Sequence, residues 1–238
     1  MKFDKVEFIY NSNAIEGYVF PKEEIRKALD RGKTDNPHIM GQIKALEYAN
    51  KIIHSQHPLT SQVLKDIHIR LMHELLKTEE VGKFREHDVT VGSHTPPNWK
   101  NLKPLINDLI YAINAKKDPW ICHCEFECIH PFADGNGRAG RILLYIQEAI
   151  QNIEPRIILN DDKQKSYYDL LTAYETKRGP ELWQIKIWRK ILKRNELLVC
   201  TSCGESFDKI IDTCIICGRS DKFIIRGEIS PFGEPIIP

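Results

Sequence analysis

The stretch His130-Pro131-Phe132-Ala133-Asp134-Gly135-Asn136-Gly137-Arg138-Ala139-Gly140-Arg141 predicts both the start of a helix and a binding site. The apolar series that follows it, Ile142 to Ile150, has the spacing of a buried helix, so a helix should begin near Asn136. A glycine-rich turn before a helix presents free backbone N–H groups at the positive end of the helix dipole. Such groups bind phosphate, and the stretch therefore predicts a phosphate site.

The polar side chains of the same stretch suit chemistry on a nucleotide. Arg138 and Arg141 are spaced i and i+3, so both should face one side of the helix and clamp phosphates with forked donors. Asp134 offers oxygen ligands of the kind that Mg2+ prefers. His130 can act as a base near neutral pH. The alternative is an ordinary helix start with surface arginines and a buried histidine, which does not explain why these groups occur together.

The stretch resembles the signature of the Fic family, His-x-Phe-x-Asp/Glu-Gly-Asn-Gly-Arg-x-x-Arg, at every specified position. The resemblance extends upstream through His123, Phe126 and Ile129. It implies transfer of AMP from Mg-ATP to a Ser, Thr or Tyr hydroxyl of a target protein. His130 would then deprotonate the hydroxyl, and Asp134 would hold Mg2+.

The resemblance also implies how ATP is held. Gly135, Asn136 and Gly137 would hold the α-phosphate region, and Arg138 and Arg141 would bind the outer phosphates. Three alternatives stay open: removal of AMP at the same site, phosphoryl transfer of the Doc-like kind, and a non-catalytic nucleotide-binding adaptor. Doc-like sequences usually carry Lys at the position of Gly137, and the intact His130 and Asp134 argue against an adaptor.

A second segment, Ser12-Asn13-Ala14-Ile15-Glu16-Gly17, resembles the inhibitory motif of the family, Ser/Thr-x-x-x-Glu followed by Gly or Asn. Ser12 and Glu16 lie one helical turn apart on one face. The Glu16 carboxylate could pair with Arg141 and remove the guanidinium that would bind the γ-phosphate. The alternative is an exposed glutamate before a Gly17 helix cap.

The segment Val81 to Trp99 interrupts the helical pattern and predicts a short β-hairpin. It resembles the family's flap, which pairs with the backbone of the target by strand addition. The flap residues would be Val89, Thr90, Val91 and Gly92. An ordinary surface hairpin is the alternative.

The C-terminal segment contains two Cys-x-x-Cys pairs, Cys200/Cys203 and Cys214/Cys217, separated by ten residues and each followed by glycine. Four thiolates at this spacing can close a tetrahedral structural Zn2+ site, and the segment resembles a small zinc ribbon. A rubredoxin-like iron site is the alternative.

The remaining sequence predicts helices. A capping pair, Asp4 and Glu7, should open a helix that Gly17 closes. Further helices are expected over 22–30, over 38–54 after Pro37, from Thr60 or Ser61 to about Leu75, over 105–113, in the segment before His130, and around 183–191. The predicted fold is mainly α: a Fic-type helical domain over 1–195 with a β-hairpin flap, followed by a small zinc ribbon over 196–238.

Composition limits the partners. The chain has 238 residues, of which 42% are hydrophobic and 28% charged, and its net charge is +1. This near-neutral balance argues against nucleic acid or anionic membranes as partners. No segment approaches the roughly 20 apolar residues of a membrane span, and we expect a cytoplasmic protein. The expected partner is a protein with a hydroxyl side chain; automodification and a homodimer are also considered.

Overall fold

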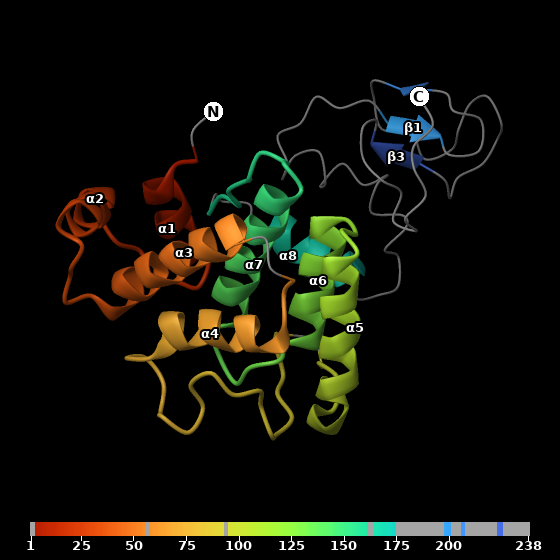
Figure 1. The fold of residues 1–238 in the computed structure, drawn as a ribbon, viewed down its shortest axis with the longest axis horizontal. Coiled ribbons are helices and arrows are strands. Elements are labelled where there is room, and N and C mark those ends of the chain that lie inside the picture. The colour runs from red at the N-terminus through yellow and green to blue at the C-terminus, as the bar shows by residue number, and fades with distance from the viewer. Residues whose placement is uncertain are drawn as a thin grey trace. The chain divides into compact units, whose positions relative to one another are not determined.

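The computed structural model of the chain describes residues 3–55, 58–92, 95–160 and 164–174, and three short strands between 198 and 225. The chain divides into two compact units, Met1–Asn160 and Asp161–Pro238 (Figure 1). The first unit is built from α1 (Lys5–Ala14), α2 (Lys22–Arg31), α3 (Pro37–Ser55), α4 (Ser61–Met72), the 3-10 turn η1 (Trp99–Asn101), α5 (Leu102–Asn114), α6 (Pro119–Ile129) and α7 (Asn136–Ile150). The second contains α8 (Gln164–Ala173), β1 (Leu198–Cys200), β2 (Ser206–Phe207) and β3 (Phe223–Ile225).

Helix α7 lies at the centre of the first unit, where α1, α3, α4 and α6 all pack against it (Figure 1). Every residue from Arg138 to Glu148 is buried. Ile142, Leu143 and Ile146 are completely inaccessible, and burial of each such side chain contributes about 1.5–3 kcal/mol to folding. The first turn of α7 is therefore held in place by most of the core.

Side-chain caps fix the starts of three helices around this core. The Asp4 carboxylate accepts hydrogen bonds from the amides of Val6 and Glu7 at the start of α1. Thr60 caps α4 through the amide of Val63, and Asp118 caps α6. Each such cap contributes about 1 kcal/mol. The helix starts predicted at Asp4 and at Thr60 are confirmed.

The helices predicted over 22–30, 38–54 and 105–113 correspond to α2, α3 and α5, and the helix predicted after the glycine-rich turn is α7. The mainly α fold class is confirmed for the described residues. The helix predicted around 183–191 lies outside them. Among the described helices, none is long and apolar enough to cross a membrane.

The hairpin predicted over Val81 to Trp99 is not confirmed. The described part of this segment, 81–92 and 95–99, consists of turns, bends and irregular backbone up to the start of η1 at Trp99, with an isolated bridge at Val91 and no strand. Thr90, Val91 and Gly92 are exposed and Val89 is half-buried. The role of this segment as a flap therefore stays a prediction, and its predicted strand pair is not found at the described positions.

The second unit contains a small antiparallel sheet with the strand order β2-β1-β3. Leu198 lies opposite Phe207 on one side and opposite Ile225 on the other. Cys200 ends β1, whereas Cys203, Cys214 and Cys217 lie outside the described residues. The zinc ribbon and the predicted domain boundary between 195 and 196 therefore stay predictions.

Candidate nucleotide site

His130 ends helix α6 in the left-handed conformation, with φ 48° and ψ 62°. Its N–H still donates to the Phe126 carbonyl, so the chain leaves the helix abruptly at this residue. A left-handed non-glycine residue costs roughly 1–3 kcal/mol and is often found where function requires it. His130 Nδ1 lies 3.3 Å from the Glu127 carbonyl oxygen. Because a carbonyl can only accept, Nδ1 carries the proton, and Nε2 is the nitrogen that can act as a base.

The loop after His130 is shaped by the side chain of Asn136. Its Oδ1 accepts from the Phe132 amide at 2.8 Å, and its Nδ2 donates to the Phe132 carbonyl at 2.9 Å. Asn136 is also buried. The side chain that the family resemblance places near the α-phosphate is thus engaged by the loop backbone, and it fixes the shape of the loop before α7.

Glycine is required at the start of α7 because the helix begins very close to α4. Gly135 has φ 76°, and its amide donates to Asp134 Oδ1 at 2.6 Å. A Cβ atom here would lie 2.6 Å from the Met72 sulfur. Among the residues that the structure describes, no side chain caps the helix at this end. The amides of the first turn, which have no intrahelical acceptor, therefore remain available for an anion.

Asp134 is positioned by the buried imidazole of His68. His68 Nδ1 accepts from the Gly82 amide at 2.9 Å, so Nε2 carries the proton and donates to the Asp134 carbonyl at 2.9 Å. The ring is stacked on Phe132, with centroids 4.0 Å apart. Burial lowers the pKa of His68 to about 4, so the ring is neutral at physiological pH. The backbone of Asp134 is fixed, while its side chain is 59% exposed.

Arg138 is a buried cation with incomplete pairing. Its Nη1 donates to His38 Nδ1 at 3.3 Å, and its Nη2 lies 4.0 Å from Asp134 Oδ2. Its Nε has no hydrogen-bond partner among the described residues, although the side chain is only 3% exposed. Burial lowers the pKa of Arg138. A buried guanidinium with an unpaired N–H is well suited to an anionic ligand such as a phosphate.

Tyr18 and His38 form an aromatic wall beside Arg138. Their rings are stacked, with centroids 4.0 Å apart, and the Arg138 guanidinium lies 5.7 Å from the centre of the Tyr18 ring. Burial, followed by the charge of Arg138, lowers the pKa of His38. A neutral His38 can accept from Arg138, so this wall orients the guanidinium.

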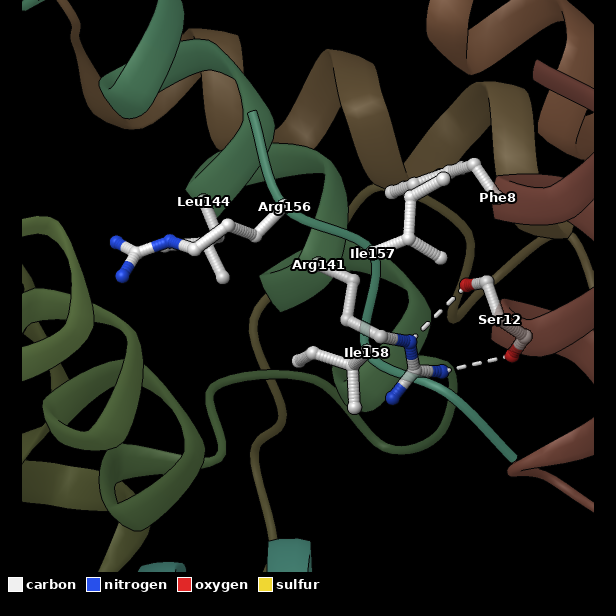
Figure 2. A pocket seen from close by; sticks show the side chains of 7 residues that line it. All are labelled: Phe8, Ser12, Arg141, Leu144, Arg156, Ile157 and Ile158. Atoms are coloured by element: carbon white, nitrogen blue, oxygen red, sulfur yellow. Dashed lines mark hydrogen bonds between the residues drawn. The ribbon is translucent and has the colours of Figure 1, made fainter. Parts of the chain in front are cut away.

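Arg141 is bound by the N-terminal helix (Figure 2). Its Nε donates to Ser12 Oγ at 3.0 Å, and its Nη2 donates to the Ser12 carbonyl at 2.8 Å and to Glu16 Oε1 at 2.6 Å. Gln42 Nε2 also donates to Ser12 Oγ at 2.9 Å. The contact expected between Glu16 and Arg141 is therefore present. Gly17 follows in a left-handed turn, and a Cβ at Gly137 would meet the Glu16 carboxylate.

A second carboxyl group, Glu127, lies buried near Arg141. Desolvation raises the pKa of Glu127 to about 8, with Arg141 lowering it and Glu16 raising it. Its Oε1 is buried without a hydrogen-bond partner among the described residues and packs against Gly140. Burial therefore favours the protonated form of Glu127, and the ion pair of Arg141 is made with Glu16.

Glu127 should make the protein less stable as the pH rises. Its folded pKa of about 8 lies above the ordinary value of 4.5 for a glutamate, so the folded chain keeps a proton that the unfolded chain releases, and stability falls through this window. The buried His68 and His123 have lowered pKa values and act in the opposite sense, but only below about pH 6.5. Glu127→Gln should therefore remove the fall in melting temperature between about pH 6.5 and 8. Each kcal/mol of unfolding free energy that the variant retains at the higher pH should correspond to about 2–4 °C in melting temperature.

Thermal unfolding at these two pH values measures the effect. The matched control is Glu125→Gln, a half-buried glutamate on the same helix, which should keep the wild-type pH dependence. The same pH dependence in Glu127→Gln and wild type would mean that the Glu127 carboxyl is ionised in the folded protein.

The structure brings most of the predicted site together in the first unit. His130, Asp134 and the residues from Gly135 to Arg141 surround the start of α7, with Ser12 and Glu16 on the side of α1. No sequence pattern predicted a supporting role for Tyr18, His38, Gln42, His68 or Glu127, because a single residue of these types carries no pattern. Arg85 lies within the segment that resembles the flap, Val81 to Trp99, but without an assigned role of its own.

Comparisons with known proteins show which proteins the chain resembles. Residues 58–147 match the model of the Fic/DOC family. The chain is 31% identical over 182 residues to the protein adenylyltransferase Fic of Aedes aegypti, which covers 70% of this chain and 36% of that protein. The chain thus spans little more than a third of this curated relative.

Two solved structures share the fold. Fic-1 from C. elegans matches with a TM-score of 0.65 at 21% identity, covering 74% of this chain and 57% of that chain. A Fic domain containing signaling protein from Bacteroides thetaiotaomicron matches with a TM-score of 0.63 at 19% identity, covering 72% of each chain. The sequence matches support the Fic family for this chain, and the two structures support its fold.

Proposed function

We propose that this chain is a Fic-family protein adenylyltransferase, which transfers AMP from Mg-ATP to a Ser, Thr or Tyr hydroxyl of a target protein. One observation carries the proposal: a histidine with a basic Nε2, an exposed carboxylate and two buried arginines surround the uncapped start of α7. The 31% identical relative is itself named a protein adenylyltransferase.

In the proposed reaction the target oxygen attacks the α-phosphorus of ATP. The new bond joins that oxygen to phosphorus, the bond from phosphorus to the pyrophosphate oxygen breaks, and the hydroxyl proton moves to His130 Nε2. General-base catalysis of this kind contributes about 10²–10⁴-fold to the rate. The amides of the first turn of α7 and the Arg138 guanidinium stabilise the phosphate oxygens in the transition state.

The residues present fit a magnesium ion. The Asp134 carboxylate is 59% exposed, its backbone is fixed by His68, and it lies beside the proposed phosphate site. A bound Mg2+ would neutralise phosphate charge and hold the outer phosphates. Asp134 would hold this ion through one carboxylate, as is usual for Mg2+ with nucleotides.

The proposal includes autoinhibition by Glu16. The Arg141 guanidinium makes three hydrogen bonds to Ser12 and Glu16, so it is not available to the γ-phosphate while α1 is in place. ATP would then bind with its α-phosphate poorly aligned for attack, and a misplacement near 1 Å can reduce the rate about 100-fold. Release of Glu16 would give the arginine to the nucleotide.

The alternatives differ in which phosphate moves. Labelled ATP tests them: protein labelled from the α-phosphate, with no label from the γ-phosphate, indicates adenylyl transfer, and the reverse indicates phosphoryl transfer. Incubation of the chain with cell extract and each labelled ATP, with His130→Ala as the blank, provides this test. Removal of AMP would appear as loss of α-label from proteins that were labelled beforehand. Automodification would appear as a labelled band at the mass of the chain itself. A homodimer would appear as twice the chain mass in analytical ultracentrifugation.

For the C-terminal segment we propose one structural Zn2+ held by Cys200, Cys203, Cys214 and Cys217. We also propose that the protein lies in the cytoplasm, where cysteines stay reduced. Four thiolates in two Cys-x-x-Cys pairs are the donor set of a closed zinc site. Because binding free energy in small metal domains is largely folding free energy, a chelator should unfold this segment and leave the helical unit folded.

Metal analysis of protein purified without chelator should give one zinc per chain. Limited proteolysis after chelation should cut beyond residue 195 and spare the first unit. One equivalent of iron, or no metal, would contradict the assignment to zinc. Cys122→Ser, a buried core thiol in α6, is the control and should keep the metal.

A further inference from the structure

Arg85 is a buried arginine that no part of the proposed chemistry uses. Its residue is 4% exposed, its guanidinium donates hydrogen bonds to backbone carbonyls, and Asp88 Oδ1 lies 3.9 Å from its Nη1. Nε donates to the His130 carbonyl at 2.8 Å, and Nη2 reaches the Ile129 carbonyl at 3.4 Å. The Arg85 amide donates to the Pro131 carbonyl at 2.9 Å. One residue thus holds three consecutive carbonyls around the proposed base.

The same guanidinium also binds the two ends of the exposed loop that contains Val91. Nη1 donates to the His87 carbonyl at 2.9 Å, and Nη2 donates to the Pro97 carbonyl at 2.6 Å. Asp88 closes the neck of this loop a second time, since its carboxylate accepts from Asn98 Nδ2 at 2.9 Å and from the Trp99 amide at 3.1 Å. The base of the loop is therefore fixed by two side chains, Arg85 and Asp88.

We propose that Arg85 is a positioning residue. It keeps the position of His130 fixed relative to the loop that begins at His87 and ends at Pro97. The inference rests on the proposed function, because it assigns to this loop the placing of the target hydroxyl before His130. Five donors in a rigid planar fork can satisfy carbonyls from two segments at once, which a single ammonium cannot. A shift of either segment by about 1 Å would move the target hydroxyl out of reach of His130 Nε2.

His68 supports the same register from the other side of the site. It joins the Gly82 amide, just before the loop, to the Asp134 carbonyl, just after His130. Arg85 and His68 thus connect the loop segment to both halves of the turn between α6 and α7. Because His68 and the Asn136 clamp hold the turn independently, loss of the Arg85 fork should disturb the loop more than it disturbs the nucleotide site.

The test compares two reactions of one sample. With Mg-ATP alone, water can replace the target hydroxyl, and AMP and pyrophosphate are released; with cell extract, AMP is joined to extract proteins. Only the second reaction needs the loop. In a Glu16→Gly background, Arg85→Lys should lower extract labelling about 100-fold, while release of AMP to water falls less than about tenfold. The ratio of the two rates does not depend on the fraction of folded protein.

Arg70→Lys is the matched control. Arg70 lies in the same unit, donates to the Asp66 carbonyl and stacks on Tyr48, and neither residue belongs to the turn between α6 and α7. The ratio of extract labelling to AMP release in Arg70→Lys should therefore equal that of Glu16→Gly alone. An unchanged ratio in Arg85→Lys, whatever the loss of total activity, would show that Arg85 is only structural. If Glu16→Gly itself neither labels extract nor releases AMP, the proposed function fails, and the inference fails with it.

Discussion

His130→Ala is expected to reduce AMP transfer by about 10²–10⁴-fold and to leave ATP affinity almost unchanged. In the proposed reaction the imidazole accepts the hydroxyl proton through Nε2, whereas the start of α7, Arg138 and Arg141 would contact the phosphates. The loss should therefore appear in turnover and not in nucleotide binding. Initial rates of α-label incorporation in the Glu16→Gly background, together with calorimetry of ATP binding, measure the two quantities separately.

His54→Ala is the matched control for this substitution. His54 is an exposed histidine near the end of α3, and its Nδ1 also contacts a helix carbonyl, that of Asn50, at 2.6 Å. Its removal should leave both turnover and affinity unchanged. A large loss of ATP affinity in His130→Ala, with transfer largely retained, would overturn the role of His130 as the base.

Glu16→Gly is expected to increase labelling of target protein about 100-fold over wild type at saturating Mg-ATP. The Glu16 carboxylate lies 2.6 Å from Arg141 Nη2, and its loss leaves the guanidinium able to turn toward a γ-phosphate. Gly137 lies beside this carboxylate and has no side chain that could pair with Arg141 in its place. The gain should lie in turnover, because a misaligned ATP is still bound by the start of α7 and by Arg138.

The double variant Glu16→Gly, Arg141→Ala distinguishes this mechanism from others. Two residues that act through one contact are not additive, so removal of Arg141 should cancel the gain. Glu23→Gln, an exposed glutamate on α2, is the control and should label as wild type does. Equal labelling by wild type and Glu16→Gly would mean that α1 is only structural. Full activity in the double variant would mean that Glu16 acts through a group other than Arg141.

The sequence predicted the helical framework well because its signals are local. The caps Asp4 and Thr60, the turn at Gly135 and the apolar spacing of α7 each depend on residues within one or two helical turns. The segment around Val91 was predicted as a hairpin from alternating valines. The described residues there form a loop, because its base is held by the side chains of Arg85 and Asp88 rather than by a ladder of backbone hydrogen bonds.

The sequence by itself determined the central motif from His130 to Arg141, since base, carboxylate, turn and arginines lie within one loop and the first turns of one helix. Only the tertiary structure decided what Arg138 and Arg85 bind. Arg138 meets His38 from 100 residues away, and Arg85 meets the His130 carbonyl from 45 residues away. A buried polar group must find a partner where helices happen to meet, and such meetings depend on the packing of the whole core. The spacing of residues along the chain carries no record of them.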